Sequence, residues 1–118
     1  MIATISRDEL KQKIDHRDEF TLVDALPEET FQEGHLPGAI NVPQQEVGRM
    51  AKKVIPDKEA EIVVYCASQD CHAAEKTAEA LMKKGYSHVR HYAGGKKDWQ
   101  EAGFPLEAQV AESHSVGP

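Results

Sequence analysis

The sequence predicts an α/β protein with a central, mostly parallel β-sheet. Short apolar runs alternate with segments of helical periodicity, and one of these runs is continuously apolar. Such a run suits a parallel strand that helices cover on both faces. With 118 residues, the chain is long enough for one domain with a modest core. We expect this domain to span residues 1–106, and residues 107–118, which lack periodicity, to form a mobile tail.

The first half of the chain contains five predicted elements. In chain order they are a helix from Ser6, a strand over 20–24, a helical turn near Phe31, a strand over 39–42 and a helix from Pro43 to Val54. Ser6 and Glu9 form a capping box, which marks the start of the first helix. Pro43 is suited to open the last helix because its fixed φ is already helical.

The second half begins with the clearest strand, the run Ile-Val-Val-Tyr over 62–65. The elements predicted after it are a helix over 74–84, a strand over 89–92, a tight turn at Gly94–Gly95 and a short helix over 98–102. The helix over 74–84 has its apolar residues at one-face spacing: Ala74, Ala78, Leu81 and Met82. Trp99 is expected in the core.

Composition and charge exclude several classes of function. The net charge is -6, so the chain lacks the basic field that would hold nucleic acid or an anionic membrane. No apolar stretch approaches the roughly 20 residues that span a bilayer, and Met1–Arg7 does not resemble a leader. A cytoplasmic protein is therefore expected. Two cysteines are too few for a disulfide-stapled scaffold, so reactive cysteine chemistry is the better expectation.

Cys66 directly follows the clearest strand. Ligands of parallel sheets bind at the carboxyl ends of the strands, and a helix N-terminus there lowers the pKa of a thiol. The loop after Cys66 consists of Ala67, Ser68, Gln69, Asp70, Cys71 and His72. Its backbone amides can form a cradle for an anionic sulfur. The alternative is a cysteine that merely ends a buried strand.

The chain resembles single-domain rhodaneses over nearly everything except its two ends. The segment over 34–43, Gly-His-Leu-Pro-Gly-Ala-Ile-Asn-Val-Pro, is specific to this resemblance, as is the ending Gly94-Gly95, Trp99 and Ala102-Gly103-Phe104-Pro105. Other matching residues are Leu22-Val23-Asp24, Phe31-Gln32-Glu33, Val63-Val64-Tyr65-Cys66, Gly85-Tyr86 and Val89. The resemblance implies a three-layer fold, in which helices flank both faces of a five-stranded sheet.

The resemblance also implies a sulfurtransferase with Cys66 as the sulfur carrier. The donor would be thiosulfate or a low-molecular-weight or protein persulfide, and the acceptor cyanide or a thiol. A sulfur-relay protein is a further expected partner, whereas nucleic acid and membranes are not. No metal or organic cofactor is required, because the intermediate is a persulfide on the cysteine itself.

The chain departs from the family pattern in three ways. An Arg and a Glu that many members carry are Leu26 and Thr30 here. The loop over 67–72 contains no Arg or Lys, so binding of dianionic thiosulfate should be weak. One or two more residues separate Cys66 from Gly85 than in members with the common six-residue loop, so either the loop or the following helix is extended.

Several residues near Cys66 have two possible roles. Cys71 is a resolving thiol that could react with Cys66, or a helix-start residue packed beneath the loop. Asp24 and His35 are expected to hold loops around the site. Ser68 could donate to bound sulfur or to its own loop, and Lys96 and Lys97 could form a positive rim. A metal site formed by Cys66, Cys71 and His72 matches no compact zinc motif.

Two other functions stay open. A catalytically silent module that senses oxidants or binds a protein through Cys66 and Cys71 would explain the nearly uncharged loop. An arsenate reductase or phosphatase would explain the one or two additional residues between Cys66 and Gly85. Such enzymes place an Arg at the sixth position after the cysteine, however, and His72 stands there, so an oxyanion would lack its bidentate partner.

Overall fold

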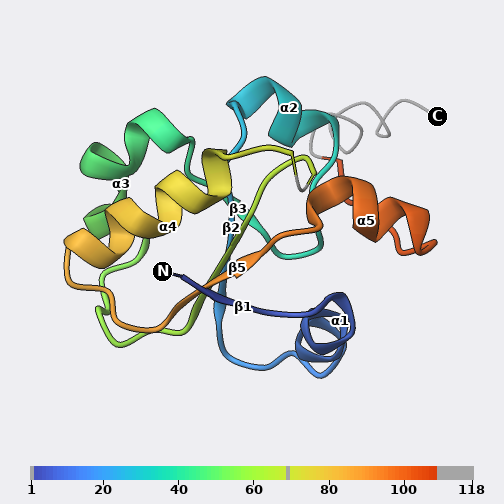
Figure 1. Cartoon of the computed structure of the whole chain (residues 1–118), viewed down its shortest axis with the longest axis horizontal. Coiled ribbons are helices and arrows are strands. Elements are labelled where there is room, and N and C mark those ends of the chain that lie inside the picture. Colours follow the sequence, from blue (N-terminus) through green and yellow to red (C-terminus); the bar gives the residue numbers. More distant parts are fainter. Residues whose placement is uncertain (1, 69, 109–118) are drawn as a thin grey trace, which may run out of the picture.

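The protein is built on a five-stranded parallel sheet (Figure 1). The computed structural model describes residues 2–68 and 70–108. The strands are β1 (Ala3–Thr4), β2 (Thr21–Asp24), β3 (Ile40–Asn41), β4 (Ile62–Tyr65) and β5 (Val89–Tyr92). Their order across the sheet is β1-β5-β4-β2-β3, and every neighbouring pair is parallel. The carboxyl ends of all five strands therefore lie at one edge, as the sequence predicts.

Helices cover both faces of the sheet, which confirms the predicted three layers. They are α1 (Arg7–Asp15), α2 (Glu28–Glu33), η1 (Gln44–Glu46), α3 (Val47–Val54), α4 (Ala73–Lys83) and α5 (Gly95–Glu101). Buried side chains of α3 and α4 pack with Ile62 and Val64 of β4 on one face. Those of α1, α2 and α5 pack with Val63 and Tyr65 on the other. Alternate residues of β4 thus enter two separate cores, which explains its continuously apolar sequence.

A local signal in the sequence accounts for the start of α1. The Ser6 side chain accepts a hydrogen bond from Glu9 N at 3.1 Å, so the predicted cap of α1 is confirmed. All four residues of β4 are buried, as is Trp99 on α5.

Several predictions at the level of elements are wrong. The turn predicted at Gly94–Gly95 covers Ala93 and Gly94 instead, and α5 already begins at Gly95 rather than at Asp98. Pro43 leads first into the 3-10 turn η1, and α3 follows at Val47. Met82 is 42% exposed, although it falls at apolar helical spacing, and Val54 at the end of α3 is 38% exposed. Each lies near the end of its helix, where a side chain can leave the face that the helix presents to the sheet.

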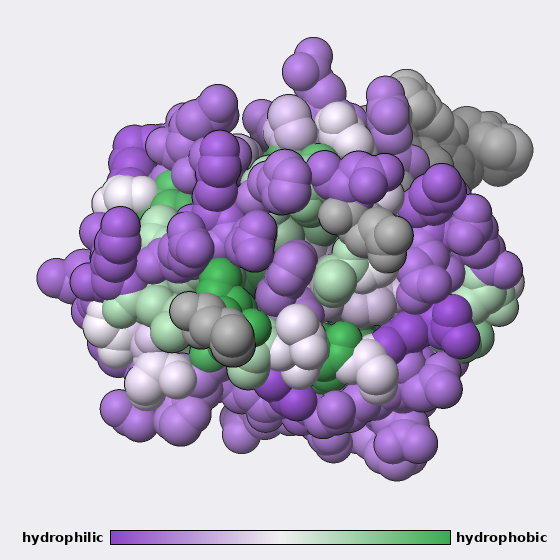
Figure 2. Space-filling view, viewed as in Figure 1, coloured by the Kyte–Doolittle hydropathy of each residue, from purple (hydrophilic) through white to green (hydrophobic). Residues whose placement is uncertain are grey.

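The domain reaches at least one residue beyond its predicted end. Glu107, the first residue of the predicted tail, pairs antiparallel with His35 through two backbone hydrogen bonds of 2.8 Å. Residues 109–118 of the predicted tail lie outside the described residues. No helix of the described part is long and apolar enough to cross a membrane. The surface seen in Figure 2 is mostly hydrophilic, with small apolar areas between charged side chains.

Candidate active site

Cys66 occupies the position after β4, between the parallel neighbours β2 and β5. The residue is only 2% exposed and belongs to the core beneath α3 and α4. Residues 67–72 connect it to α4, which begins at Ala73. Six residues therefore separate Cys66 from the first residue of α4.

The N-terminus of α5 holds the first two peptide units of the loop. Lys96 N donates a hydrogen bond to Cys66 O at 2.9 Å, and Lys97 N donates to Ala67 O at 2.8 Å. Gly95 makes this close approach possible: its φ is +67°, and a Cβ there would lie 2.5 Å from Cys66 O. The pair Gly94–Gly95 thus places a helix against the cysteine loop, a role that sequence reasoning missed.

The loop uses part of its own hydrogen-bonding capacity. Cys71 N donates to Ser68 O at 3.0 Å, and Asp70 N to Ser68 Oγ at 3.4 Å. The Ser68 hydroxyl oxygen thus accepts a hydrogen bond within its own loop, whereas both predicted roles are those of a donor. Within the described residues, the amides of Ala67, Ser68 and His72 donate to no acceptor and can serve an anion. Gln69, which the sequence also assigns to the cradle, lies outside the described residues.

Cys71 lies against Cys66, a proximity that the sequence spacing left open. The two residues form a disulfide with a Cα–Cα distance of 6.4 Å. This separation falls within the usual range for disulfides. Cys66 Sγ also lies 3.3 Å from the Cys71 carbonyl oxygen. Unlike Cys66, Cys71 is partly exposed.

The surface beside the loop is acidic. A pocket of about 220 Å³ is lined by Ser68, Asp70, Gly94, Lys97, Asp98 and Glu101. The lining thus carries three carboxylates and one ammonium group, and Asp98 also pairs with Arg7 at 3.2 Å. His72 is exposed, and its Nδ1 lies 3.6 Å from Glu75 Oε1. None of the described loop residues supplies an Arg or Lys side chain to pair with a bound oxyanion.

Asp24 is fully buried at the end of β2 and joins three segments of the chain. Its carboxylate accepts hydrogen bonds from Leu26 N at 2.8 Å and from the Tyr65 hydroxyl at 2.7 Å. The same hydroxyl accepts from Leu36 N at 3.0 Å. Burial raises the pKa of Asp24, against the opposing effect of the hydrogen bonds it accepts. Burial also raises the pKa of Tyr65, so its hydroxyl stays protonated and available as a donor.

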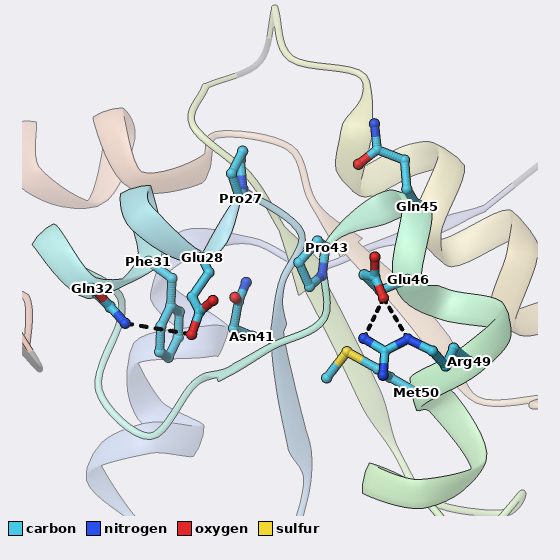
Figure 3. A pocket seen from close by; sticks show the side chains of 10 residues that line it. All are labelled: Pro27, Glu28, Phe31, Gln32, Asn41, Pro43, Gln45, Glu46, Arg49 and Met50. Atoms are coloured by element: carbon cyan, nitrogen blue, oxygen red, sulfur yellow. Dashed lines mark hydrogen bonds and ion pairs between the residues drawn. The ribbon is translucent and has the colours of Figure 1, made fainter.

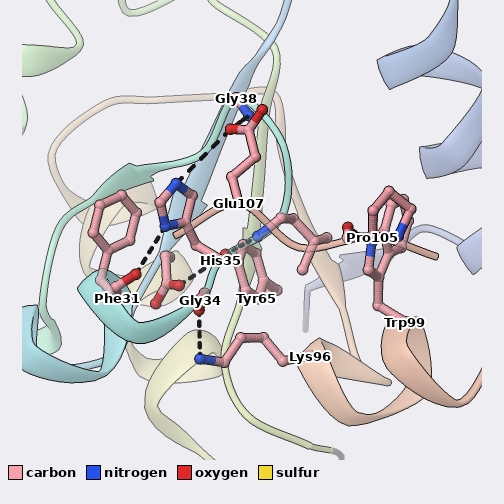
Figure 4. Close-up of polar contacts among 11 residues, drawn as sticks. Phe31, Gly34, His35, Gly38, Tyr65, Lys96, Trp99, Pro105 and Glu107 are labelled. Carbon is pink, nitrogen blue, oxygen red and sulfur yellow. Dashed lines mark hydrogen bonds and ion pairs between the residues drawn. The ribbon is translucent and has the colours of Figure 1, made fainter. Parts of the chain in front are cut away.

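His35 is buried and holds the end of α2 to the C-terminal segment (Figure 4). Its Nδ1 lies 2.8 Å from Phe31 O, and because a carbonyl only accepts, Nδ1 carries the proton. The ring stacks on Phe31 with centroids 3.9 Å apart, and its Nε2 lies 3.9 Å from Glu107 Oε1. Asp24 and His35 thus both tie loops together, the kind of contact expected of positioning residues.

Lys96 does not extend freely into a positive rim. Its Nζ donates to Gly34 O at 2.6 Å and lies 3.4 Å from Thr30 O, so it caps the C-terminal end of α2 (Figure 4). Leu26, which stands where many members carry the Arg, is buried in the core. The region where many members carry an Arg and a Glu is thus held here by an apolar contact and a lysine cap.

A groove of about 620 Å³ opens at the same edge of the sheet (Figure 3). It is lined by Pro27, Glu28, Phe31, Gln32, Asn41, Pro43, Gln45, Glu46, Arg49 and Met50. Since no described loop residue lines it, we assign it no part in the chemistry of Cys66. Over the described residues, no group of three or more His, Cys, Asp or Glu side chains gathers in a geometry that could hold a metal ion.

Comparison with known proteins identifies the family. The model of the rhodanese-like domain matches residues 6–102. The chain belongs to the rhodanese-like domain family. Its fold agrees with this: the BH2092 protein from Bacillus halodurans superimposes with a TM-score of 0.84 at 25% identity, over 92% of this chain and 78% of that one.

Curated relatives of this rhodanese-like domain include a named sulfurtransferase. Thiosulfate sulfurtransferase PspE of Escherichia coli is 37% identical over 64% of this chain and 70% of its own length. The HTH-type transcriptional regulator Rv0324 of Mycobacterium tuberculosis is 33% identical over 81% of the chain, and the putative sulfur carrier protein YrkF of Bacillus subtilis 29% over 83%. The chain spans only 41% and 51% of these last two proteins.

Proposed function

We propose that this rhodanese-like domain is a sulfurtransferase that carries sulfur as a persulfide on Cys66. The observation that carries the proposal is the placement of Cys66. It directly follows a central parallel strand, within a loop whose first two carbonyls are held by α5. A nucleophile fixed by rigid elements, beside amides that can receive an anion, suits a two-step displacement.

The first step loads the cysteine. The reduced Cys66 thiolate attacks the outer sulfur of the donor, the sulfur–sulfur bond of the donor breaks, and sulfite or a thiolate leaves. The free amides of Ala67, Ser68 and His72 stabilise the resulting persulfide anion. In the second step a thiol or cyanide takes the outer sulfur, and the Cys66 thiolate leaves. The enzyme alternates between its free and persulfide forms, which predicts ping-pong kinetics.

Persulfides of glutathione or of a protein are the proposed donors in preference to thiosulfate. Thiosulfate carries two negative charges close to its reacting sulfur. Asp98 in the pocket beside the loop is paired with Arg7, which leaves Asp70 and Glu101 against a single Lys97. Such a surface repels a small dianion. The likeness to a putative sulfur carrier protein supports a protein thiol as the acceptor.

Turnover with cyanide as acceptor tests this proposal. Reduced wild type should form thiocyanate from either donor, with the larger kcat/KM for glutathione persulfide, whereas Cys66→Ser should fall to the rate of a protein-free blank. Ser is nearly isosteric with Cys, so circular dichroism should show the same fold. Cys71→Ser, which changes the other sulfur of the loop, should still form thiocyanate. Undiminished turnover by Cys66→Ser would overturn the proposal.

A further inference from the structure

We propose that Cys71 resolves the Cys66 persulfide by forming the Cys66–Cys71 disulfide and expelling sulfide. The protein then acts as a persulfide reductase that consumes a dithiol, in addition to transferring sulfur. This inference rests on the proposed persulfide at Cys66. The observation that carries it is that Cys66 and Cys71 lie against each other and differ in their exposure to solvent.

The structure already contains the product of the proposed step. Cys66 and Cys71 are bonded, and their Cα atoms lie 6.4 Å apart. The hydrogen bond from Cys71 N to Ser68 O also holds together the segment between the two cysteines. The Cys71 sulfur therefore reaches the inner sulfur of a Cys66 persulfide without any rearrangement of β4 or α4. An attacking group held in place in this way has a large effective concentration.

The electron and proton balance is simple. The Cys71 sulfur attacks Cys66 Sγ, the new bond forms between the two Sγ atoms, and the bond from Cys66 Sγ to the outer sulfur breaks. The outer sulfur leaves with the electron pair of that bond and takes the Cys71 proton, so HS⁻ is released. A dithiol of the thioredoxin class then reduces the disulfide by two electrons, becomes a disulfide itself and returns both cysteines to thiols.

Exposure directs the reductant to the correct sulfur. Cys66 is 2% exposed, whereas Cys71 is partly exposed. Cys71 lies next to His72, the residue that precedes α4. An external thiol consequently meets Cys71 first, and attack there expels the Cys66 thiolate. That thiolate is received by the same free amides that would hold the persulfide. Reduction therefore regenerates the carrier cysteine in its reactive form.

The local charge favours release over storage of the sulfur. The described loop residues contain Asp70 but no Arg or Lys. A persulfide anion here has backbone dipoles around it and no cation from the described loop residues, and Lys97 of the neighbouring pocket is accompanied there by carboxylates. Resolution by Cys71 replaces this anion by a neutral disulfide and sends the negative charge into solvent as HS⁻.

A single-turnover experiment without oxygen or added reductant tests the inference. Reduced wild type, Cys71→Ser and Cys66→Ser each receive one equivalent of glutathione persulfide. Sulfide is followed with a fluorescent probe, and the protein is weighed intact under non-reducing conditions. Wild type should release one equivalent of sulfide and lose the mass of two hydrogens. Cys71→Ser should gain one sulfur atom, with sulfide release about tenfold or more slower. Cys66→Ser should do neither.

The outcomes separate this inference from the proposed function. If wild type keeps the extra sulfur as Cys71→Ser does, the resolving role is overturned while the persulfide carrier stands. If Cys71→Ser gains no sulfur, the proposed function fails and this inference fails with it. If wild type forms the disulfide with peroxide but not with the persulfide, Cys71 belongs to an oxidant sensor, and the reductase activity is likewise overturned. A Cys71→Ala variant repeats the test without a hydroxyl in the loop.

Discussion

At the residue scale, one buried hydroxyl joins the segments around the candidate site. The Tyr65 side chain donates to Asp24 and accepts from Leu36 N. The sequence suggested a supporting role for Asp24 and His35 but not for Tyr65 or Lys96. A tyrosine in an apolar run is typical of core, and a lysine is usually solvated. Their hydrogen bonds reach 29 to 66 residues along the chain, a range that local patterns do not contain.

Removing that hydroxyl should destabilise the protein. In Tyr65→Phe, Leu36 N and Asp24 Oδ2 each lose a buried partner, and we expect unfolding to become easier by about 1–3 kcal/mol. Chemical denaturation checks this. Tyr92→Phe is the matched control, because its hydroxyl binds the partly exposed Asp98, and it should cost less. Equal losses in the two variants would contradict the assigned role of Tyr65.

At the scale of elements, the sequence located the central strands well and the contacts between loops poorly. β2, β4 and β5 are recognisable because each contains buried apolar residues, although β5 also carries the partly exposed Arg90 and His91. β1 is not, because its two exposed residues join the sheet only along β5. The start of α5 and the approach of Cys71 to Cys66 depend on how neighbouring loops meet. Spacing along the chain does not determine that geometry.

Substituting Gly95 should damage the site through α5. In Gly95→Ala, the added Cβ would overlap Cys66 O and Ser68 N, so the helix or the loop must shift. We expect sulfur loading of Cys66 to slow by about 100-fold, measured by rapid-quench mass spectrometry.

Gly103→Ala is the control, since Gly103 also has a positive φ of +85° but nothing within 4 Å of an added Cβ. Gly103→Ala should lose about 1–3 kcal/mol of stability through backbone strain. It should load sulfur onto Cys66 at the wild-type rate. If both variants load equally, the contact between α5 and the loop does not matter to the reaction.

At the scale of the whole molecule, the topology brings the chemistry to one edge. Parallel pairing throughout the sheet places the carboxyl end of β4 between those of β2 and β5. The alternation of elements alone predicts this edge as the place of the site. The chain's negative charge, -6 in total, extends to that edge through the acidic pocket beside the loop.

This charge predicts how loading from thiosulfate depends on salt. The rate should rise with ionic strength, because screening weakens the repulsion of the dianion. Asp70→Asn should raise the rate at low salt and flatten the salt dependence. The control Glu79→Gln removes the same charge from an exposed position on α4 outside the pocket and should have a smaller effect. A rate that falls with salt in wild type would contradict this account of donor choice.

The most direct test of the account is the intact mass of reduced Cys71→Ser after exposure to glutathione persulfide, followed by cyanide. In this variant the sulfur cannot be lost through Cys71, so we expect a gain of one sulfur atom that cyanide removes. Peptide mapping should place that sulfur on Cys66. An unchanged mass, or a sulfur that remains when Cys66 is also replaced by Ser, would contradict the claim that Cys66 is the carrier.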